Sequence, residues 1–184
     1  MKPYNIVLYI LLCIGITACG QAPIQSYTNS KPTLNLREFF NGDLVVYGIL
    51  QDRKGKVTRK FTATIDARWE GNAGYLNEVF FFDDGTQDTR NWVLQEDAQG
   101  NVTGTAGDVV GIAKGQLNGS TLHWRYTLAI PYKNSTLNVA IDDWLYLVTR
   151  DRLLNKSVLK KWGFRVGELT LVIEKQEPAI LPAS

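Results

Sequence analysis

VTRKFTATIDARW, residues 57–69, alternates apolar and polar side chains along almost its whole length. The apolar positions are Val57, Phe61, Ala63, Ile65, Ala67 and Trp69. Successive side chains of a β-strand point to opposite faces, so this period of two predicts a long strand with one buried face. Arg59 is the clear exception on the apolar face.

Similar segments lie on both sides of this strand, and short turns rich in Gly, Asn and Asp separate them. They cover residues 42–51, 75–83, 89–97, 101–117, 121–130, 135–149 and 166–175. Short turns between consecutive strands favour antiparallel hairpins. Closure into a barrel would leave no exposed edge strand. We therefore predict an all-β fold, a single antiparallel up-and-down β-barrel of about 8–10 strands, over residues 36–176.

Only the stretch DRLLNKSVLKKWG, residues 151–163, departs from this pattern. Its apolar residues are Leu153, Leu154, Val158, Leu159 and Trp162, and their spacing suits a helix. Gly163 stands where a glycine commonly ends a helix. We predict one short helix, or turns, packed on the barrel.

The N-terminus predicts export from the cytoplasm. Lys2 precedes an apolar run, residues 6–16, whose length fits a secretory signal rather than a membrane span of roughly 20 residues. ITACG, residues 16–20, then matches the lipobox of bacterial lipoproteins. A lipobox implies cleavage after Ala18 and acylation of Cys19, which anchors the chain stably in a bilayer. An ordinary cleaved signal, or an uncleaved span, with a chance cysteine is the alternative.

These features predict the organisation of the chain and its location. We expect a signal peptide over residues 1–18, lipidated Cys19 with a flexible tether over 19–35, the barrel over 36–176 and a loose tail over 177–184. Gly20 stands where an aspartate would resemble an inner-membrane retention signal. The expected location is therefore the cell envelope, on the periplasmic face of the outer membrane.

Composition argues against several classes of function. The formal net charge is only +2, which gives no basic footprint for nucleic acid. Cys13 would leave with the signal and Cys19 would carry lipid, so no thiol would remain for a disulfide or a nucleophile. His123 is the only histidine, and we expect it to be exposed on a polar strand face. We therefore predict no metal site, no cofactor and no Ser-His-Asp catalysis.

Tryptophans recur along the predicted strands at positions 69, 92, 124, 144 and 162. They are typical of core and barrel-lining positions. A barrel of about eight strands encloses either packed side chains or one small ligand. Trp92, Trp124 and Trp144 are therefore candidate ligand contacts, with a packed core as the alternative.

Charged residues inside strands are the second candidate feature. Placing Phe82 opposite Asp88 makes Glu78 and Arg90 diagonal neighbours on a largely apolar face. In IDDWLYLV, residues 141–148, alternation forces one of two adjacent aspartates inward, and Asp143 shares a face with Ile141 and Leu145.

A buried charge needs a partner, so we expect an internal cluster of Glu78, Arg90 and Asp143, with Arg59 or Arg90 pairing Asp143. Three roles stay open for it: an ion-pair network that fixes strand register, a site for a ligand headgroup, and catalytic carboxylates.

The glycine-rich stretch GTAGDVVGIAKG, residues 104–115, does not predict a phosphate loop, because no GK[ST] follows and no helix begins there. It suits a sharp bend, bulges or a close backbone approach in a barrel. We expect Asp108 to cap this bend through backbone amides.

Several motifs together resemble one known family. They are the opening FFNGD with DRKG in the first turn, DDG followed by RNW, GTAGDVVGIAKG, and IDDW followed by Asn155 and Lys161. Over residues 37–175 the chain resembles the bacterial lipoprotein family known as domain of unknown function 3833. That resemblance implies a calycin-like, lipocalin-type barrel and no established activity. Leu145 stands where the family pattern has methionine, a conservative apolar change.

The leading functional hypothesis is a membrane-anchored periplasmic lipoprotein that binds a hydrophobic or lipid-like ligand in its barrel. The aromatic residues would line the cavity, and Glu78, Arg90 and Asp143 would orient the polar end of the ligand. The first alternative is an accessory envelope protein with a filled barrel that docks a protein partner through its rim. A lipid-modifying enzyme that uses carboxylates is the third.

Overall fold

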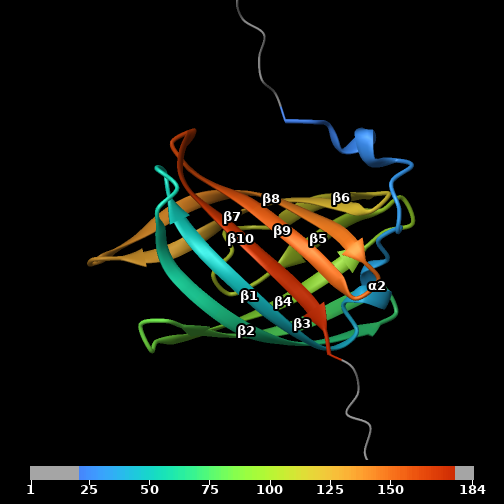
Figure 1. Ribbon diagram of the computed structural model, residues 1–184, viewed down its shortest axis with the longest axis horizontal. Coiled ribbons are helices and arrows are strands. Elements are labelled where there is room, and N and C mark those ends of the chain that lie inside the picture. Colours follow the sequence, from blue (N-terminus) through green and yellow to red (C-terminus); the bar gives the residue numbers. More distant parts are fainter. Residues whose placement is uncertain (1–20, 177–184) are drawn as a thin grey trace, which may run out of the picture.

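The structure, a computed structural model, describes residues 21–176 (Figure 1). The predicted signal peptide, Cys19 and the predicted tail 177–184 lie outside the described residues. Within residues 21–176, no helix is long and apolar enough to cross a membrane.

Over residues 21–176, ten strands follow one another in chain order and form one closed antiparallel barrel. Closure occurs because β1 pairs with β10 on one side and with β2 on the other. The all-β, up-and-down barrel predicted from the sequence is confirmed. The elements are η1 (Ile24–Tyr27), α2 (Leu36–Phe39), β1 (Gly42–Asp52), β2 (Val57–Glu70), β3 (Ala73–Phe82), β4 (Gln87–Glu96), β5 (Asn101–Thr105), β6 (Ala113–Asn118), β7 (Thr121–Tyr132), β8 (Ser135–Thr149), β9 (Arg152–Lys161) and β10 (Phe164–Lys175).

The alternating stretch of residues 57–69 lies in β2, as predicted. Phe61, Ala63, Ile65 and Ala67 are buried, and the residues between them are exposed. Inward residues of the other strands join them in one apolar core inside the barrel. The period of two therefore separates the interior from the outer surface.

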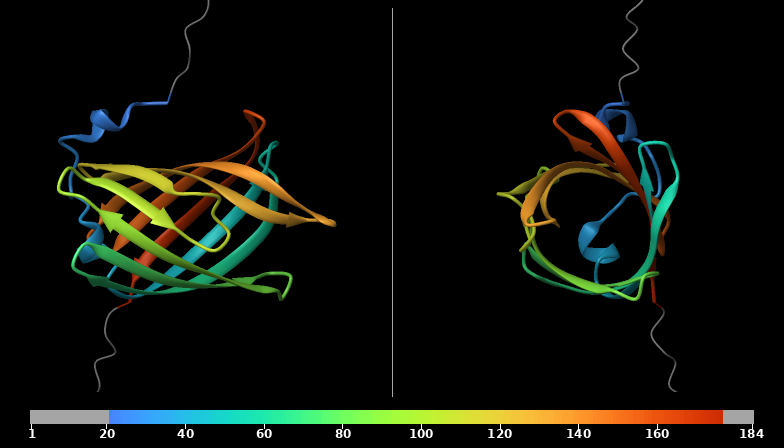
Figure 2. Two further views of the ribbon diagram at one scale, coloured as in Figure 1. Left: turned by 180° about the vertical axis from the view of Figure 1, so that it is seen from behind. Right: turned by 90° about the vertical axis from the view of Figure 1, so that its left-hand side faces the viewer.

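Helix α2 closes one end of the barrel. The end-on view of Figure 2 shows it inside the ring of strands. Leu36, Phe39 and Phe40 are at most 4% exposed and belong to the core. The hairpins β1–β2, β3–β4, β7–β8 and β9–β10 lie at the opposite end, because every odd-numbered strand starts at the α2 end.

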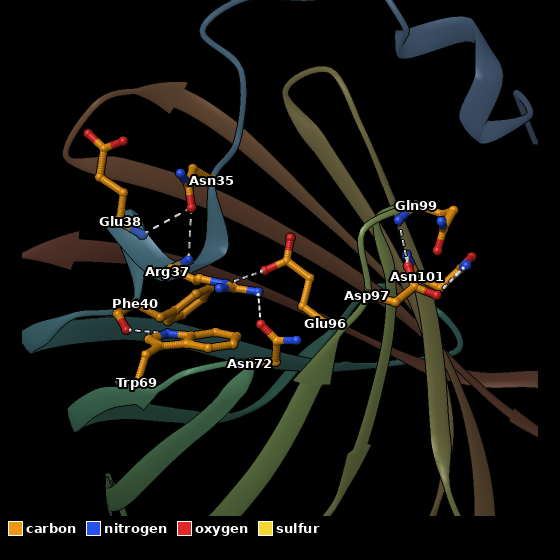
Figure 3. A network of polar contacts seen from close by, with 10 residues as sticks. All are labelled: Asn35, Arg37, Glu38, Phe40, Trp69, Asn72, Glu96, Asp97, Gln99 and Asn101. Carbon is orange, nitrogen blue, oxygen red and sulfur yellow. Dashed lines mark hydrogen bonds and ion pairs between the residues drawn. The ribbon is translucent and has the colours of Figure 1, made fainter.

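Polar contacts fix α2 at this end (Figure 3). The Asn35 side chain caps the helix by accepting hydrogen bonds from the backbone N–H groups of Arg37 and Glu38. Arg37 pairs with Glu96 on β4, with 3.3 Å between Nε and Oε2. The Trp69 indole N–H donates to the Phe40 carbonyl over 2.9 Å. Strands β2 and β4 thus both hold the helix in place.

The helix predicted over residues 151–163 is wrong, because residues 152–161 form strand β9. Leu153, Asn155 and Ser157 all point inward, and each is at most 3% exposed. Two of these three inward positions are polar. The apolar residues alone therefore showed no period of two, and Leu154 faces outward at 38% exposure.

Residues 24–30, which lie in the segment predicted from the sequence to be a flexible tether, pack on the outside of the barrel. Ile24 in η1 is 8% exposed. The Tyr27 ring lies 5.9 Å from the ring of Trp144 on β8. Ser30 Oγ accepts a hydrogen bond from the backbone N–H of Ser120 over 2.8 Å. The N-terminal segment therefore covers part of the outer face of β7 and β8.

Candidate functional site

A cavity of about 130 Å³ lies inside the barrel. Leu36 and Phe40 form its floor, and side chains from most of the strands form its wall. Most of its surface is apolar. The residues predicted to contact a ligand that line it are Glu78, Arg90, Trp92, Trp124 and Asp143.

Trp92 and Trp124 build one side of the cavity. Their rings meet edge to face, with centroids 5.8 Å apart. Gly104 and Gly115 on β5 and β6 make room for Trp124. A Cβ at Gly104 would lie 3.0 Å from the indole of Trp124, and one at Gly115 would lie 2.5 Å from it. Part of the glycine-rich stretch therefore serves a close approach to an aromatic ring, one of the alternatives predicted from the sequence.

The hairpin of β3 and β4 brings Glu78 directly opposite Arg90, rather than diagonally to it. The register differs by two residues from the predicted one, since Asp88 pairs with Phe80 instead of Phe82. The reason is a turn centred one residue earlier than predicted, over residues 83–85, which is closed by a hydrogen bond from the Phe82 N–H to the Thr86 carbonyl. Arg90 Nη1 and Glu78 Oε2 are 3.9 Å apart.

The shorter contacts of Arg90 go to Asp108, in the loop between β5 and β6. Arg90 Nε donates to both carboxylate oxygens of Asp108 over 3.0 Å, and Nη2 donates to Oδ2 over 2.7 Å. Such bidentate pairs are among the strongest hydrogen bonds in proteins. Asp108 therefore binds a side chain, instead of only capping the loop through its backbone as expected.

Asp143 points into the barrel, and Asp142 points outward. The buried Asp143 carboxylate accepts a hydrogen bond from Ser157 Oγ over 2.7 Å and another from Asn155 Nδ2. Neutral donors on β9, and not an arginine, are thus its partners in hydrogen bonding.

The predicted partner Arg59 lies elsewhere. It pairs with Asp84 at 2.9 Å and stacks over the Phe82 ring, near the β3–β4 turn. Its guanidinium therefore belongs to the rim of the barrel and not to the internal cluster.

Trp144 does not line the cavity, which corrects its place among the predicted ligand contacts. It lies on the outer face of β8, stacked on the His123 ring with centroids 3.9 Å apart. His123 was expected to be exposed, but its side chain is only 16% exposed because Asp142 and Trp144 cover it. Asp142 Oδ1 lies 2.7 Å from His123 Nε2, and Asp142 Oδ2 lies 2.8 Å from Lys160 Nζ.

Burial governs the acid–base properties of the internal cluster. It raises the pKa of Glu78 to about 7, against the opposing charge of Arg90. It also raises the pKa of Asp143, although hydrogen bonds from Ser157, Asn155 and Tyr126 oppose the shift. Burial by itself would lower the pKa of Arg90, but the bonds to Asp108 and the charge of Glu78 outweigh it and leave that pKa raised.

The raised pKa of Glu78 predicts a specific dependence of stability on pH. An acid whose pKa rises on folding favours the folded state below its unfolded pKa of 4.5, and this contribution disappears as the pH rises to about 7. Glu78→Gln removes the charge and keeps the shape. We expect the variant to be more stable than the wild type by up to about 3 kcal/mol at pH 8, and equally stable near pH 4.5.

Urea unfolding at both pH values measures this difference. Glu70→Gln is the matched control, because the Glu70 side chain is exposed. The difference in unfolding free energy between this variant and the wild type should be the same at both pH values. An equal stability difference at both pH values for Glu78→Gln would rule out a carboxylate that titrates near neutrality.

Residues 21–176 contain no group of three or more His, Cys, Asp or Glu side chains placed to hold a metal ion.

Sequence reasoning missed Asp108, Asn155, Ser157 and Tyr126 in this site. Tyr126 lies beside Trp92, with ring centroids 5.4 Å apart, and also lines the cavity. Inward polar residues on β9 would have been detectable as a second period of two, with Asn155 and Ser157 at its inward positions. Asp108 gave no such signal, because its partner is set by the path of a loop.

Comparison with solved structures shows that the fold is similar to that of an S-type phycobiliprotein lyase from Guillardia theta. The TM-score is 0.54 with 10% sequence identity, over 79% of this chain and 95% of the lyase. This likeness supports a lipocalin-like barrel. No curated protein matches the chain significantly. The sequence matches the family described as "Protein of unknown function (DUF3833)" over residues 13–175, and the chain therefore belongs to that family.

Proposed function

We propose that the barrel binds one small hydrophobic molecule, or the hydrophobic end of a lipid-like molecule, in its cavity. The observation that carries the proposal is the cavity itself, a largely apolar space inside the barrel whose lining includes a few polar groups, among them Glu78, Arg90 and Asp143. Ligand sites are typically apolar pockets in which a small number of polar groups fix orientation. The lipocalin-like fold supports the same function.

The size of the cavity limits what it holds. An apolar cavity of about 150 Å³ in another protein binds benzene. A cavity of about 130 Å³ therefore accepts a group of similar size, such as one ring or a short acyl segment. A longer ligand would extend beyond the cavity or push side chains apart.

The location of the protein is part of the proposal. The lipobox at residues 16–20 supports acylation of Cys19 and anchoring in the cell envelope, with the barrel in the periplasm. In that place the protein would bind a hydrophobic molecule that is poorly soluble in water. Lipid at Cys19 would hold the barrel close to a bilayer as a source or destination of the ligand.

A second candidate function, docking of an envelope protein, is favoured by the tip of the β9–β10 hairpin. Trp162 and Phe164 are 85% and 76% exposed there, and Lys161 and Arg165 flank them. Exposed aromatic residues are enriched in protein interfaces. This hairpin lies at the end of the barrel opposite α2.

Filling the cavity tests the proposal. Ala63 is 1% exposed, lines the cavity and faces Phe80 across the β2–β3 pair. Ala63→Leu should occupy the space of the ligand. We expect one molecule of 1-hexanol to bind the wild type in isothermal titration calorimetry, and the variant to bind about tenfold more weakly or less.

Thr64→Leu is the matched control. It adds leucine at the adjacent position of β2, which faces outward. We expect 1-hexanol to bind this variant as it binds the wild type. Equal binding by both leucine variants would place the alcohol outside the cavity and contradict the proposal.

A further inference from the structure

We infer that the ligand carries a protonated amine at its polar end, bound by the Glu78 and Asp143 carboxylates inside the barrel. This inference rests on the proposed function, because it names the chemical class of the molecule in the same cavity. It excludes anions such as free fatty acid carboxylates, which the presence of an arginine in the cavity wall would otherwise suggest.

The guanidinium of Arg90 is already occupied. Arg90 Nε and Nη2 donate hydrogen bonds to the Asp108 carboxylate over 2.7–3.0 Å, and only Nη1 is directed toward Glu78. An anionic ligand would have to compete with Asp108, whose loop position holds it in bidentate geometry. Arg90 is therefore a structural partner of Asp108 and not a free anion receptor.

The hydrogen-bond donors on β9 are also committed to a carboxylate. Ser157 Oγ and Asn155 Nδ2 donate to Asp143. A ligand carboxylate in this cavity would lie beside the Glu78 and Asp143 carboxyl groups, and burying a further acid there is costly.

Carboxyl groups outnumber cationic groups at this point of the barrel. Glu78, Asp143 and Asp108 stand against one guanidinium, that of Arg90. Glu78 has no cationic atom closer than 3.9 Å, and its side chain is 14% exposed. A buried charge of this kind gains strongly from a compensating partner at hydrogen-bond distance. A primary ammonium supplies three donors and one positive charge in a small group.

The aromatic wall suits the same group. Phe80 and Trp92 line the cavity beside Glu78 and Arg90. Their ring faces attract cations, and the Arg90 guanidinium already lies 5.6 Å from the centre of the Phe80 ring. An alkyl chain on the ammonium would extend into the apolar part of the cavity toward α2.

The amine should bind more tightly at high pH, because it needs Glu78 ionised and that carboxyl has a pKa of about 7. The charged and titratable groups that face Glu78 are Arg90 on β4, Asp108 in the β5–β6 loop, Tyr126 on β7 and Asp143 on β8. Arg90 and Tyr126 keep their protonation state between pH 6 and 8, since both have raised pKa values. Over this range ionisation of Glu78, together with that of Asp143, whose pKa burial also raises, therefore controls affinity.

The test compares three ligands with one chain length, n-hexylamine, 1-hexanol and hexanoate, by isothermal titration calorimetry at pH 8. We expect the protonated amine to bind about tenfold more tightly than the alcohol, and hexanoate to bind at least about thirtyfold more weakly than the amine. Glu78→Gln should remove the advantage of the amine over the alcohol. At pH 6 the affinity for the amine should fall, and that for the alcohol should not.

Each outcome decides the inference. Equal binding of all three ligands, or tightest binding of hexanoate, would overturn the inference and leave the hydrophobic cavity intact. An unchanged preference for the amine in Glu78→Gln would overturn it as well. Failure of all three ligands to bind the folded protein would overturn the proposed function together with it. An amine occurs both in free alkylamines and in aminophospholipid headgroups. Dihexanoyl phosphatidylethanolamine is therefore added as a fourth ligand. If it binds as hexylamine does, the site is assigned to a headgroup.

Discussion

The Arg90→Met protein is expected to unfold at pH 8 with a free energy about 3–5 kcal/mol below that of the wild type. Methionine preserves the apolar part of the side chain but leaves Glu78 and Asp108 without their shared cation. Removing one partner of a buried ion pair is costly because the remaining charge stays away from water. At pH 5 the loss should shrink, since Glu78 then takes up a proton.

Two further variants isolate the electrostatic part of this loss. Adding Glu78→Gln to Arg90→Met should recover about half of the lost stability or more, because the uncompensated charge is gone. Arg59→Met removes an arginine at the rim, whose partner Asp84 is half exposed, and should cost less than about 1 kcal/mol. Equal losses for Arg90→Met and Arg59→Met in urea unfolding would show that the internal cluster carries no buried charge.

The second large effect is expected from Gly119→Ala, in the turn between β6 and β7. Gly119 has φ of +55°, and a Cβ there would lie 1.8 Å from the Tyr27 carbonyl oxygen. The alanine variant should force η1 and the residues around it away from the barrel. We expect a loss of roughly 2–4 kcal/mol, from the exposure of Ile24 and Tyr27 and from strain in the left-handed backbone.

Gly71→Ala separates strain from displacement. Gly71 also has a positive φ, of +60°, but nothing lies within 4 Å of the position of its Cβ. That variant should lose only about 1–2 kcal/mol. Limited proteolysis should cleave Gly119→Ala within residues 24–33 much faster than either Gly71→Ala or the wild type. Equal cleavage of all three proteins would contradict the packing of the N-terminal segment on the barrel.

The sequence predicted the barrel because alternation extends through most strands without interruption. In β2 every inward residue except Arg59 is apolar, so the buried face could be recognised from the amino-acid sequence. In β9 the same signal was absent, because Asn155 and Ser157 occupy inward positions as donors to Asp143. A polar residue that is buried for its hydrogen bond cannot be recognised before its partner is known.

The candidate site was predictable in part for a related reason. Asp143, Glu78 and Arg90 were identified because a charge on an apolar strand face requires a partner. Their pairing was not, since it depends on the residue at which the β3–β4 turn is centred and on a loop that carries Asp108 to Arg90. Trp144 was wrongly predicted to contact a ligand, because alternation separates the two faces of β8 but does not show which face lines the cavity. Trp144 lies on the outer face, which the N-terminal segment covers.

The central claim is that the barrel is a receptor for a small hydrophobic molecule, and native mass spectrometry tests it most directly. The chain from Gly20 onward, exported to the periplasm without lipid, would be purified under mild conditions and compared in its native and denatured states. We expect an added mass at one copy per chain in the native spectrum of the wild type, lost on denaturation and absent from Ala63→Leu. A wild-type protein that carries no added mass, and gains none with n-hexylamine or 1-hexanol, would contradict it.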